Sequence, residues 1–161
     1  MLRTLALCLC LSAAAFAQTS PQPGVNVYQP NASPDAYAVD LAGNVVHTWP
    51  GTNPAGITAV YMAPNGDLVR TLTTGTPPGG AGSGGGVERV SWDGQVVWSF
   101  TYSNAQVHSH HDIALMPNGN VLVIAWENVG AAGAIAAGRN FATVSTEFLA
   151  EQVIEIEPDG M

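Results

Sequence analysis

The chain has 161 residues, with 12 acidic residues against 4 arginines, no lysine and a formal net charge of −8. This length is typical of one domain with a substantial core. Such an acidic surface repels nucleic acid and anionic lipid, so we expect neither as a partner. It also repels an anionic substrate at long range, so a site for one has to be built from local donors. Each arginine and histidine is therefore a candidate binding residue.

Residues 1–17 have the pattern of a secretory signal peptide. A lone Arg3 precedes an apolar run over 5–16, and the segment ends on small residues that suit cleavage. Cys8 and Cys10 both lie in this leader, so the mature chain has no thiol or disulfide chemistry. No later apolar segment approaches the roughly 20 residues that cross a bilayer. The sequence therefore predicts export to the periplasm or the medium, without a membrane anchor.

Two segments of the remaining chain, 18–161, are nearly parallel in pattern. AYAVDLAGNVVHTW and ITAVYMAPNGDLVRTL correspond to VERVSWDGQVVWSF and HHDIALMPNGNVLVIAW, so that Gly43 aligns with Gly94 and Asn65 with Asn118. Runs rich in Val, Ile, Leu, Tyr and Trp with partial alternation predict strands. Asn-Gly and Asp-Gly steps between them supply the positive φ angles of tight turns. Each segment is therefore predicted to be two β-hairpins in succession.

Four short strands repeating at roughly 50 residues match the period of a β-propeller blade. We therefore predict an all-β domain of four-stranded blades, with blade 1 at about 24–73, blade 2 at about 87–127 and the start of blade 3 at about 151–161. The first strand of blade 3 is predicted to end at a turn at Asp159-Gly160. A β-sandwich is the alternative, although it gives no reason for the turns to repeat. A ring needs about four or more blades, so we expect an incomplete propeller that is part of a longer protein. Assembly of several copies into one ring is the other option.

Two irregular stretches separate the predicted strands. The sequence PPGGAGSGGG at 77–86 predicts a flexible loop, and it is not a phosphate loop because no Gly-Lys-Ser/Thr follows. The alanine-rich stretch 128–139 permits a short helix with Asn128 as its N-cap and Gly138 as its C-terminal stop.

Three of the four histidines gather in the stretch VHSHHDIALMPNGNVLVIAW. Alternate residues of a strand share a face, which predicts His108, His110 and Asp112 on one side and His111 on the other. A carboxylate two residues from an imidazole can fix its tautomer. The first repeat has Ile-Thr-Ala at the aligned positions 57–59, so the fold does not demand these polar groups. The cluster therefore predicts a site near a rim of the propeller, with ordinary hydrogen bonding at a strand start as the alternative.

The spacing His108-x-His110-x-Asp112 also begins the metal-binding signature of metallo-β-lactamase-type hydrolases. That signature has another histidine where this chain has Ile113, and the repeat lacks the helices of such a fold. We therefore predict no metal and no cofactor, and keep zinc-dependent hydrolysis as a third interpretation.

The remaining histidine and two of the arginines are predicted to be structural. His47 aligns with Trp98 of the second repeat, and Arg70 and Arg89 lie within predicted strands.

Four segments in this order, GNVVHTW, SHHDIALMPNGNVLVIAWE, AIAAGRN and VIEIEPDG, resemble secreted bacterial arylsulfotransferase-like proteins, the group related to aryl-sulfate sulfotransferase. The resemblance covers nearly all of the mature chain, from Gly24 to Gly160, and HHD followed by PNGN is its most specific part. It implies a six-bladed propeller that moves a sulfuryl group from a phenolic sulfate ester to a phenol through a sulfo-histidine, without a nucleotide donor. An imidazole is a competent nucleophile, and cationic donors stabilise charge on the equatorial oxygens.

The resemblance also implies residue roles. His110 and His111 match the family motif and are expected to bind the sulfate and stabilise the transition state, with Asp112 orienting one ring. Arg139 and His108 are expected to bind substrate, although Arg139 also suits a solvated charge at a helix end. The covalent histidine of the characterised enzymes lies in later blades, so we expect this chain alone to be inactive and marginally stable. A non-catalytic exported propeller that binds a ligand or a protein is the second interpretation of its function.

Overall fold

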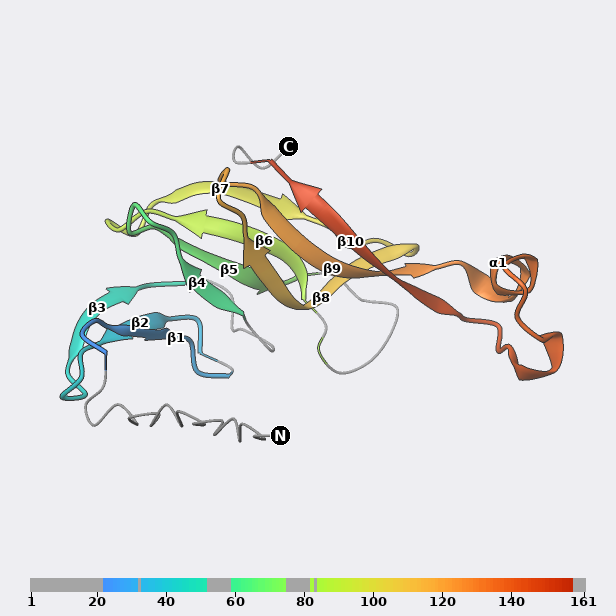
Figure 1. Cartoon of the computed structure of the whole chain (residues 1–161), viewed down its shortest axis with the longest axis horizontal. Coiled ribbons are helices and arrows are strands. Elements are labelled where there is room, and N and C mark those ends of the chain that lie inside the picture. The colour runs from blue at the N-terminus through green and yellow to red at the C-terminus, as the bar shows by residue number, and fades with distance from the viewer. Residues whose placement is uncertain (1–21, 32, 52–58, 75–81, 83, 158–161) are drawn as a thin grey trace, which may run out of the picture.

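The structure, a computed structural model, describes residues 22–31, 33–51, 59–74, 82 and 84–157. Within them, three antiparallel sheets have the strand orders β1-β2-β3, β4-β5-β6-β7 and β8-β9-β10 (Figure 1). The elements are β1 (Asn26–Tyr28), β2 (Ala36–Val39), β3 (Val45–Trp49), β4 (Val60–Met62), β5 (Leu68–Thr73), β6 (Gly85–Val90), β7 (Val96–Thr101), β8 (Val107–Leu115), β9 (Val121–Asn128), α1 (Gly130–Ala136), the 3-10 turn η1 (Phe141–Thr143) and β10 (Leu149–Ile156). The mostly β class is confirmed. The predicted signal peptide 1–17 and the predicted turn at Asp159-Gly160 lie outside the described residues.

Four hairpin turns have one common geometry. Gly43, Gly66, Gly94 and Gly119 have φ of 87°, 89°, 82° and 92°, and each donates its backbone N–H to the carbonyl three residues earlier. The preceding Ala, Asn or Asp is not in the positive-φ region. Each turn is therefore a type I turn closed by a left-handed glycine, and the glycine alone supplies the positive φ. The positions of the predicted hairpins are confirmed.

The strands pair in a different grouping from the predicted blades. The four-stranded sheet joins β4 and β5, the second hairpin of the first repeat, to β6 and β7, the first hairpin of the second repeat. The predicted grouping at 24–73 and 87–127 therefore has to be shifted by one hairpin. β10 begins no separate sheet, because it pairs along its full length with β9. The described sheets form an open stack, and they do not close into a propeller.

The registers confirm the internal repeat. Val60↔Arg70 in the β4–β5 pair corresponds to Ile113↔Val123 in the β8–β9 pair. The β2–β3 and β6–β7 pairs each have an irregularity one residue from the end of the first strand. One hairpin therefore recurs in β1-β2-β3 and the four-stranded sheet, and the other recurs in the four-stranded sheet and β8-β9-β10.

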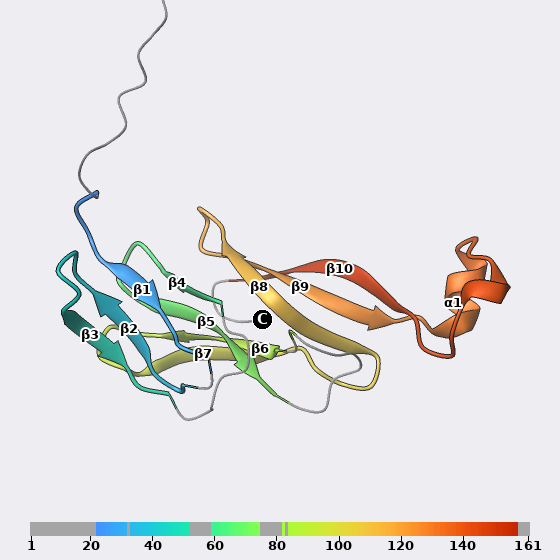
Figure 2. The ribbon, with the colours of Figure 1, turned by 90° about the horizontal axis from the view of Figure 1, so that it is seen from below.

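The three sheets lie face to face in Figure 2, and an apolar core fills the space between each pair of neighbouring sheets. The first core joins the four-stranded sheet to β8-β9-β10 and contains Val69, Val87, Trp98, Ile113, Val121, Val123 and Ile156. The second joins the four-stranded sheet to β1-β2-β3 and contains Ala36, Ala38, Trp49, Leu68 and Val90. The central strand β5 is thus buried on both faces, which explains its run of four consecutive buried residues.

Two irregular segments differ in detail from prediction. Gly85 and Gly86 belong to β6 rather than to a loop over 77–86, of which the structure also describes residues 82 and 84. The helix within 128–139 is confirmed, but its N-cap is Val129, and Asn128 instead accepts a hydrogen bond from the backbone of Gly130. Gly138 has φ 94° and ends the helix as predicted.

Candidate functional site

The histidine cluster lies on a bulge of β8. Ser109 pairs with Ala125 and Ile113 pairs with Val123, so three residues of β8 stand opposite one residue of β9. His111, in the middle of the bulge, has φ 52° and is the one non-glycine with positive φ among the described residues. A bulge of this kind breaks the alternation of faces and turns side chains in new directions. The predicted division into His108, His110 and Asp112 on one face and His111 on the other is therefore wrong.

His110 is buried, and Trp126 and Glu151 both contact its ring. Its side chain is 4% exposed, its ring stacks on Trp126 at 4.0 Å between centroids, and its Nε2 lies 2.9 Å from Oε2 of Glu151. The indole Nε1 of Trp126 donates to the other carboxylate oxygen, Oε1, at 3.0 Å. Burial lowers the pKa of His110, the carboxylate of Glu151 opposes this shift, and the neighbouring His111 adds to it. The neutral imidazole is thus the favoured form.

His111 is the exposed member of the pair. Its Nδ1 lies 2.8 Å from Nδ1 of His110, with the two rings nearly perpendicular at 89°. Its backbone N–H donates to the carbonyl of Gly82 at 2.8 Å. A Cβ on Gly82 would lie 2.2 Å from Nε2 of His111, so only glycine leaves room for the ring. Of the two predicted histidines, His111 is the one that a ligand can reach.

His108 is fully buried at 0% exposure, and its Nδ1 lies 2.8 Å from the hydroxyl oxygen of Ser103. Ser103 and His108 also form a β-bridge that closes the β7–β8 connection. A side chain in this position has no surface to offer a substrate. The predicted substrate-binding role is therefore replaced by a structural one.

The burial of His108 gives stability a dependence on pH. Burial, and secondarily His110, lowers the pKa of His108, so the unfolded chain takes up the proton first. Stability should be complete above about pH 6.5 and should fall as the pH drops below it, with a slope of at most about 1.4 kcal/mol per pH unit for this group. We expect His108→Gln to lose less stability than the wild type between about pH 7.5 and pH 5 in urea titrations. Equal losses would contradict this assignment.

Asp112 does not orient an imidazole. Its Oδ1 accepts hydrogen bonds from the hydroxyl of Tyr61, at 3.1 Å, and from the backbone N–H of Ile113, at 2.8 Å. Burial and the bond to Asp112 raise the pKa of Tyr61. The predicted role of Asp112 is therefore wrong, because Glu151 is the carboxylate that contacts His110. Asp112 instead connects β8 to β4, the first strands of two neighbouring sheets.

Arg139 lies apart from the histidines. It follows α1, its backbone N–H donates to Ala134, and its guanidinium lies 5.0 Å from the ring centroid of Phe148. Figure 1 shows α1 beyond the ends of β9 and β10, on an arm that projects from the sheets. The structure does not bring the predicted cationic partner to the site.

The three residues predicted to be structural have packing or pairing roles. Arg70 pairs with Glu88 and Arg89 with Asp67. His47 stacks on Trp92 at 3.8 Å between ring centroids.

Sequence reasoning missed Glu151 and Trp126. The register places them opposite each other on β10 and β9, where the four-stranded sheet has Gly85 opposite Thr73. The repeated sheet therefore forms without an acidic or an aromatic side chain at these positions. The change from Thr73 to Trp126 is visible in the sequence repeat. Only the pairing of β10 with β9 shows that Glu151 occupies the position of Gly85.

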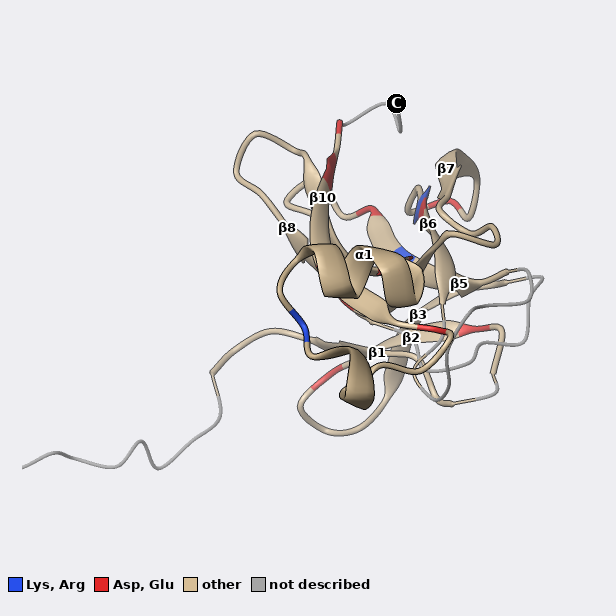
Figure 3. Cartoon of the chain, turned by 90° about the vertical axis from the view of Figure 1, so that its right-hand side faces the viewer, with Lys and Arg blue, Asp and Glu red and all other residues tan. Residues whose placement is uncertain are grey.

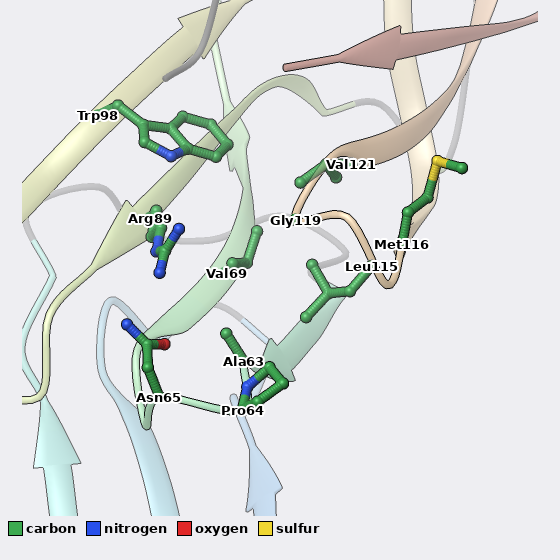
Figure 4. Close-up of a pocket in the computed structure, with 10 residues that line it drawn as sticks. All are labelled: Ala63, Pro64, Asn65, Val69, Arg89, Trp98, Leu115, Met116, Gly119 and Val121. Carbon is green, nitrogen blue, oxygen red and sulfur yellow. The ribbon is translucent and has the colours of Figure 1, made fainter. Parts of the chain in front are cut away.

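A separate cavity of about 250 Å³ lies between the four-stranded sheet and β8-β9-β10, at their hairpin turns (Figure 4). Arg89, Trp98, Leu115, Met116 and Val121 are among its lining residues, and no histidine lines it. The Nε of Arg89 already donates to Asp67 at 2.7 Å. This cavity is an apolar gap between packed sheets rather than part of the histidine site.

The described part of the chain has no group of three histidine, cysteine, aspartate or glutamate side chains so placed that they could hold a metal ion. It also has no helix long and apolar enough to cross a membrane. Acidic segments are spread over several strands and loops in Figure 3, whereas basic segments are sparse. Comparison with models of known families, with curated protein sequences and with solved structures gives no match to this chain.

Proposed function

We propose that this chain carries part of an arylsulfotransferase-type site, which transfers a sulfuryl group from a phenolic sulfate ester to a phenol through a sulfo-histidine. The observation that carries the proposal is the imidazole pair at the β8 bulge, in which His110 is buried and His111 is exposed. Adjacent imidazoles can donate to sulfate oxygens, accept a phenolic proton or carry a transferred group. Support for this particular chemistry comes from the HHD and PNGN segments, and we further propose a propeller architecture and export.

The first test is acceptor-dependent release of nitrophenol from p-nitrophenyl sulfate in the presence of a phenol. The purified chain is assayed together with any longer product that its coding sequence specifies. We expect His111→Ala to lower the transfer rate by about 100-fold or more, because a positioned acid–base or charge-stabilising group typically contributes that much. Gln106→Ala is a matched control, since this exposed side chain lies next to β8 and forms no hydrogen bond with a histidine among the described residues. Unchanged transfer by a folded His111→Ala variant would overturn the assignment.

A non-catalytic exported binding protein is the second candidate. Two carboxylates, Asp112 and Glu151, lie around the histidines, and no arginine contacts them among the described residues. Such a site attracts a neutral or cationic ligand more readily than a sulfate ester. Binding of a phenol without transfer from any aryl sulfate would favour this candidate.

A further inference from the structure

The hydrogen bonds around Glu151 determine where the protons of the imidazole pair lie. The carboxylate accepts only, so Nε2 of His110, 2.9 Å away, carries a proton and donates it. The other carboxylate oxygen accepts from the indole of Trp126, which is a donor only. Each carboxylate oxygen therefore accepts one hydrogen bond from the protein, although the side chain of Glu151 is 68% exposed.

The same reasoning continues to His111. A neutral His110 with its proton on Nε2 has a bare Nδ1, which has to accept the 2.8 Å hydrogen bond from Nδ1 of His111. A neutral His111 with its proton on Nδ1 then has a bare Nε2. No described residue donates a hydrogen bond to this atom, and the side chain is exposed. The series of hydrogen bonds from Glu151 through His110 to His111 thus ends at Nε2 of His111, which has a lone pair available to accept a proton.

We propose that Glu151 is a positioning residue that acts through His110 to keep Nε2 of His111 free of a proton, so that this atom accepts the proton of an acceptor phenol. The inference rests on the proposed sulfuryl transfer for its substrate. In the acceptor step, the phenolic O–H bond breaks and its proton passes to Nε2. The phenol oxygen forms the new bond to sulfur, and the bond from sulfur to the carrier histidine breaks with its electron pair remaining on that nitrogen. The carboxylate of Glu151, acting through His110, then stabilises the imidazolium that forms at His111.

The internal repeat shows that this arrangement is specific to the last described sheet. Trp126 and Glu151 replace Thr73 and Gly85 of the four-stranded sheet. The backbone pairing is the same in both sheets, so sheet formation alone does not account for the replacement. Trp126 has two functions here, because its ring packs on His110 and its N–H holds Glu151.

Glu151→Gln tests the proposal with nearly unchanged shape. The amide has one accepting oxygen, which the indole of Trp126 requires, and its NH₂ group then faces Nε2 of His110. His110 would have to accept there and donate from Nδ1, so that Nδ1 of His111 becomes bare and its Nε2 becomes protonated. The ¹⁵N shifts of the ring nitrogens of His110 and His111, recorded at mildly alkaline pH, distinguish the two tautomers. We expect both tautomers to invert.

Glu155→Gln is the matched control. Glu155 lies on the same strand and contacts Asn120, so the substitution removes one negative charge without touching the histidines. We expect wild-type tautomers in this variant. In the transfer assay, Glu151→Gln should lower kcat by about 100-fold or more with a smaller change in KM, while Glu155→Gln should have little effect.

The two proposals fail in different ways. A proton on Nε2 of His111 in the wild-type protein would overturn the inference whether or not the protein transfers sulfuryl groups. The same holds if a folded Glu151→Gln variant keeps the wild-type tautomers. The predicted tautomers without any transfer from an aryl sulfate would leave the inference intact and contradict the proposed function.

Discussion

Replacing Glu88 by alanine is expected to destabilise the protein by about 3–5 kcal/mol, because it leaves the buried guanidinium of Arg70 without its counter-charge. The Nε of Arg70 donates to Oε1 of Glu88 at 2.6 Å, and the arginine side chain is only 4% exposed. Arginine does not release its proton on burial, so the free-energy cost of a buried, unpaired charge remains. Arg70 also donates to the carbonyl oxygens of Pro34, at 3.0 Å, and Pro50, at 3.3 Å. The guanidinium of Arg70 therefore connects the four-stranded sheet to the residues that flank β2 and β3.

Urea unfolding of variants at positions 70 and 88 would test this expectation. The variant with Arg70→Met and Glu88→Met together should be markedly more stable than Glu88→Ala, because two packed apolar side chains replace a buried pair at little cost. Arg89→Met supplies the comparison, since Arg89 is 22% exposed and its partner Asp67 keeps the hydrogen bond from Nδ2 of Asn65 at 2.9 Å, so we expect a smaller loss than for Glu88→Ala. A Glu88→Ala variant within about 1 kcal/mol of the wild type would show that Arg70 is not effectively buried.

Trp49→Ala is the second substitution with a large expected effect, a loss of about 3–5 kcal/mol. Trp49 has no exposed surface and lies in the core between β1-β2-β3 and the four-stranded sheet, together with Leu68 and Val90. It also contacts the rings of His47 and Trp92 edge-on, at 4.4 Å and 5.3 Å between centroids. Truncation would open a cavity that these rigid neighbours cannot fill.

The comparison variants for this prediction are Trp92→Ala and Trp49→Phe. Trp92 is 45% exposed, so its truncation should cost clearly less than that of Trp49. Trp49→Phe keeps an aromatic ring and should give an intermediate loss. Denaturant midpoints would report the stability of each variant, and near-ultraviolet circular dichroism would report the packing of its aromatic side chains. If Trp49→Ala were no worse than Trp92→Ala, β1-β2-β3 would not be packed on its neighbour as described.

The strands and turns were predictable because their signals are local. A glycine closes each hairpin turn at Gly43, Gly66, Gly94 and Gly119, and apolar residues alternate on either side. The assignment of hairpins to sheets was not predictable in the same way. A period of about 50 residues is the same wherever the first strand of the repeat is placed, so only the pairing of β5 with β6 shows where one sheet ends.

The gathering of His108, His110 and His111 in the sequence predicts a candidate site, and the structure brings His110 and His111 into contact, but the hydrogen bonding around them was not predictable from the sequence. Regular alternation assumes an uninterrupted strand, and the bulge on β8 violates this assumption. Asp112 was the nearest carboxylate in sequence, whereas Glu151 is nearest in space through the pairing of β10 with β9. A contact between residues 41 positions apart depends on register, which composition and spacing do not encode.

The backbone of His111 has a consequence for how this chain can change. At φ 52° a side chain disfavours the native conformation by about 1–2 kcal/mol, a penalty that glycine does not have. Folding alone would thus favour glycine at this position. Glycine would, however, remove the imidazole of His111, the last group in the hydrogen-bonded series that begins at Glu151. Replacement of His111 by glycine would therefore relieve the backbone penalty and, on the proposed function, remove a group that the transfer requires.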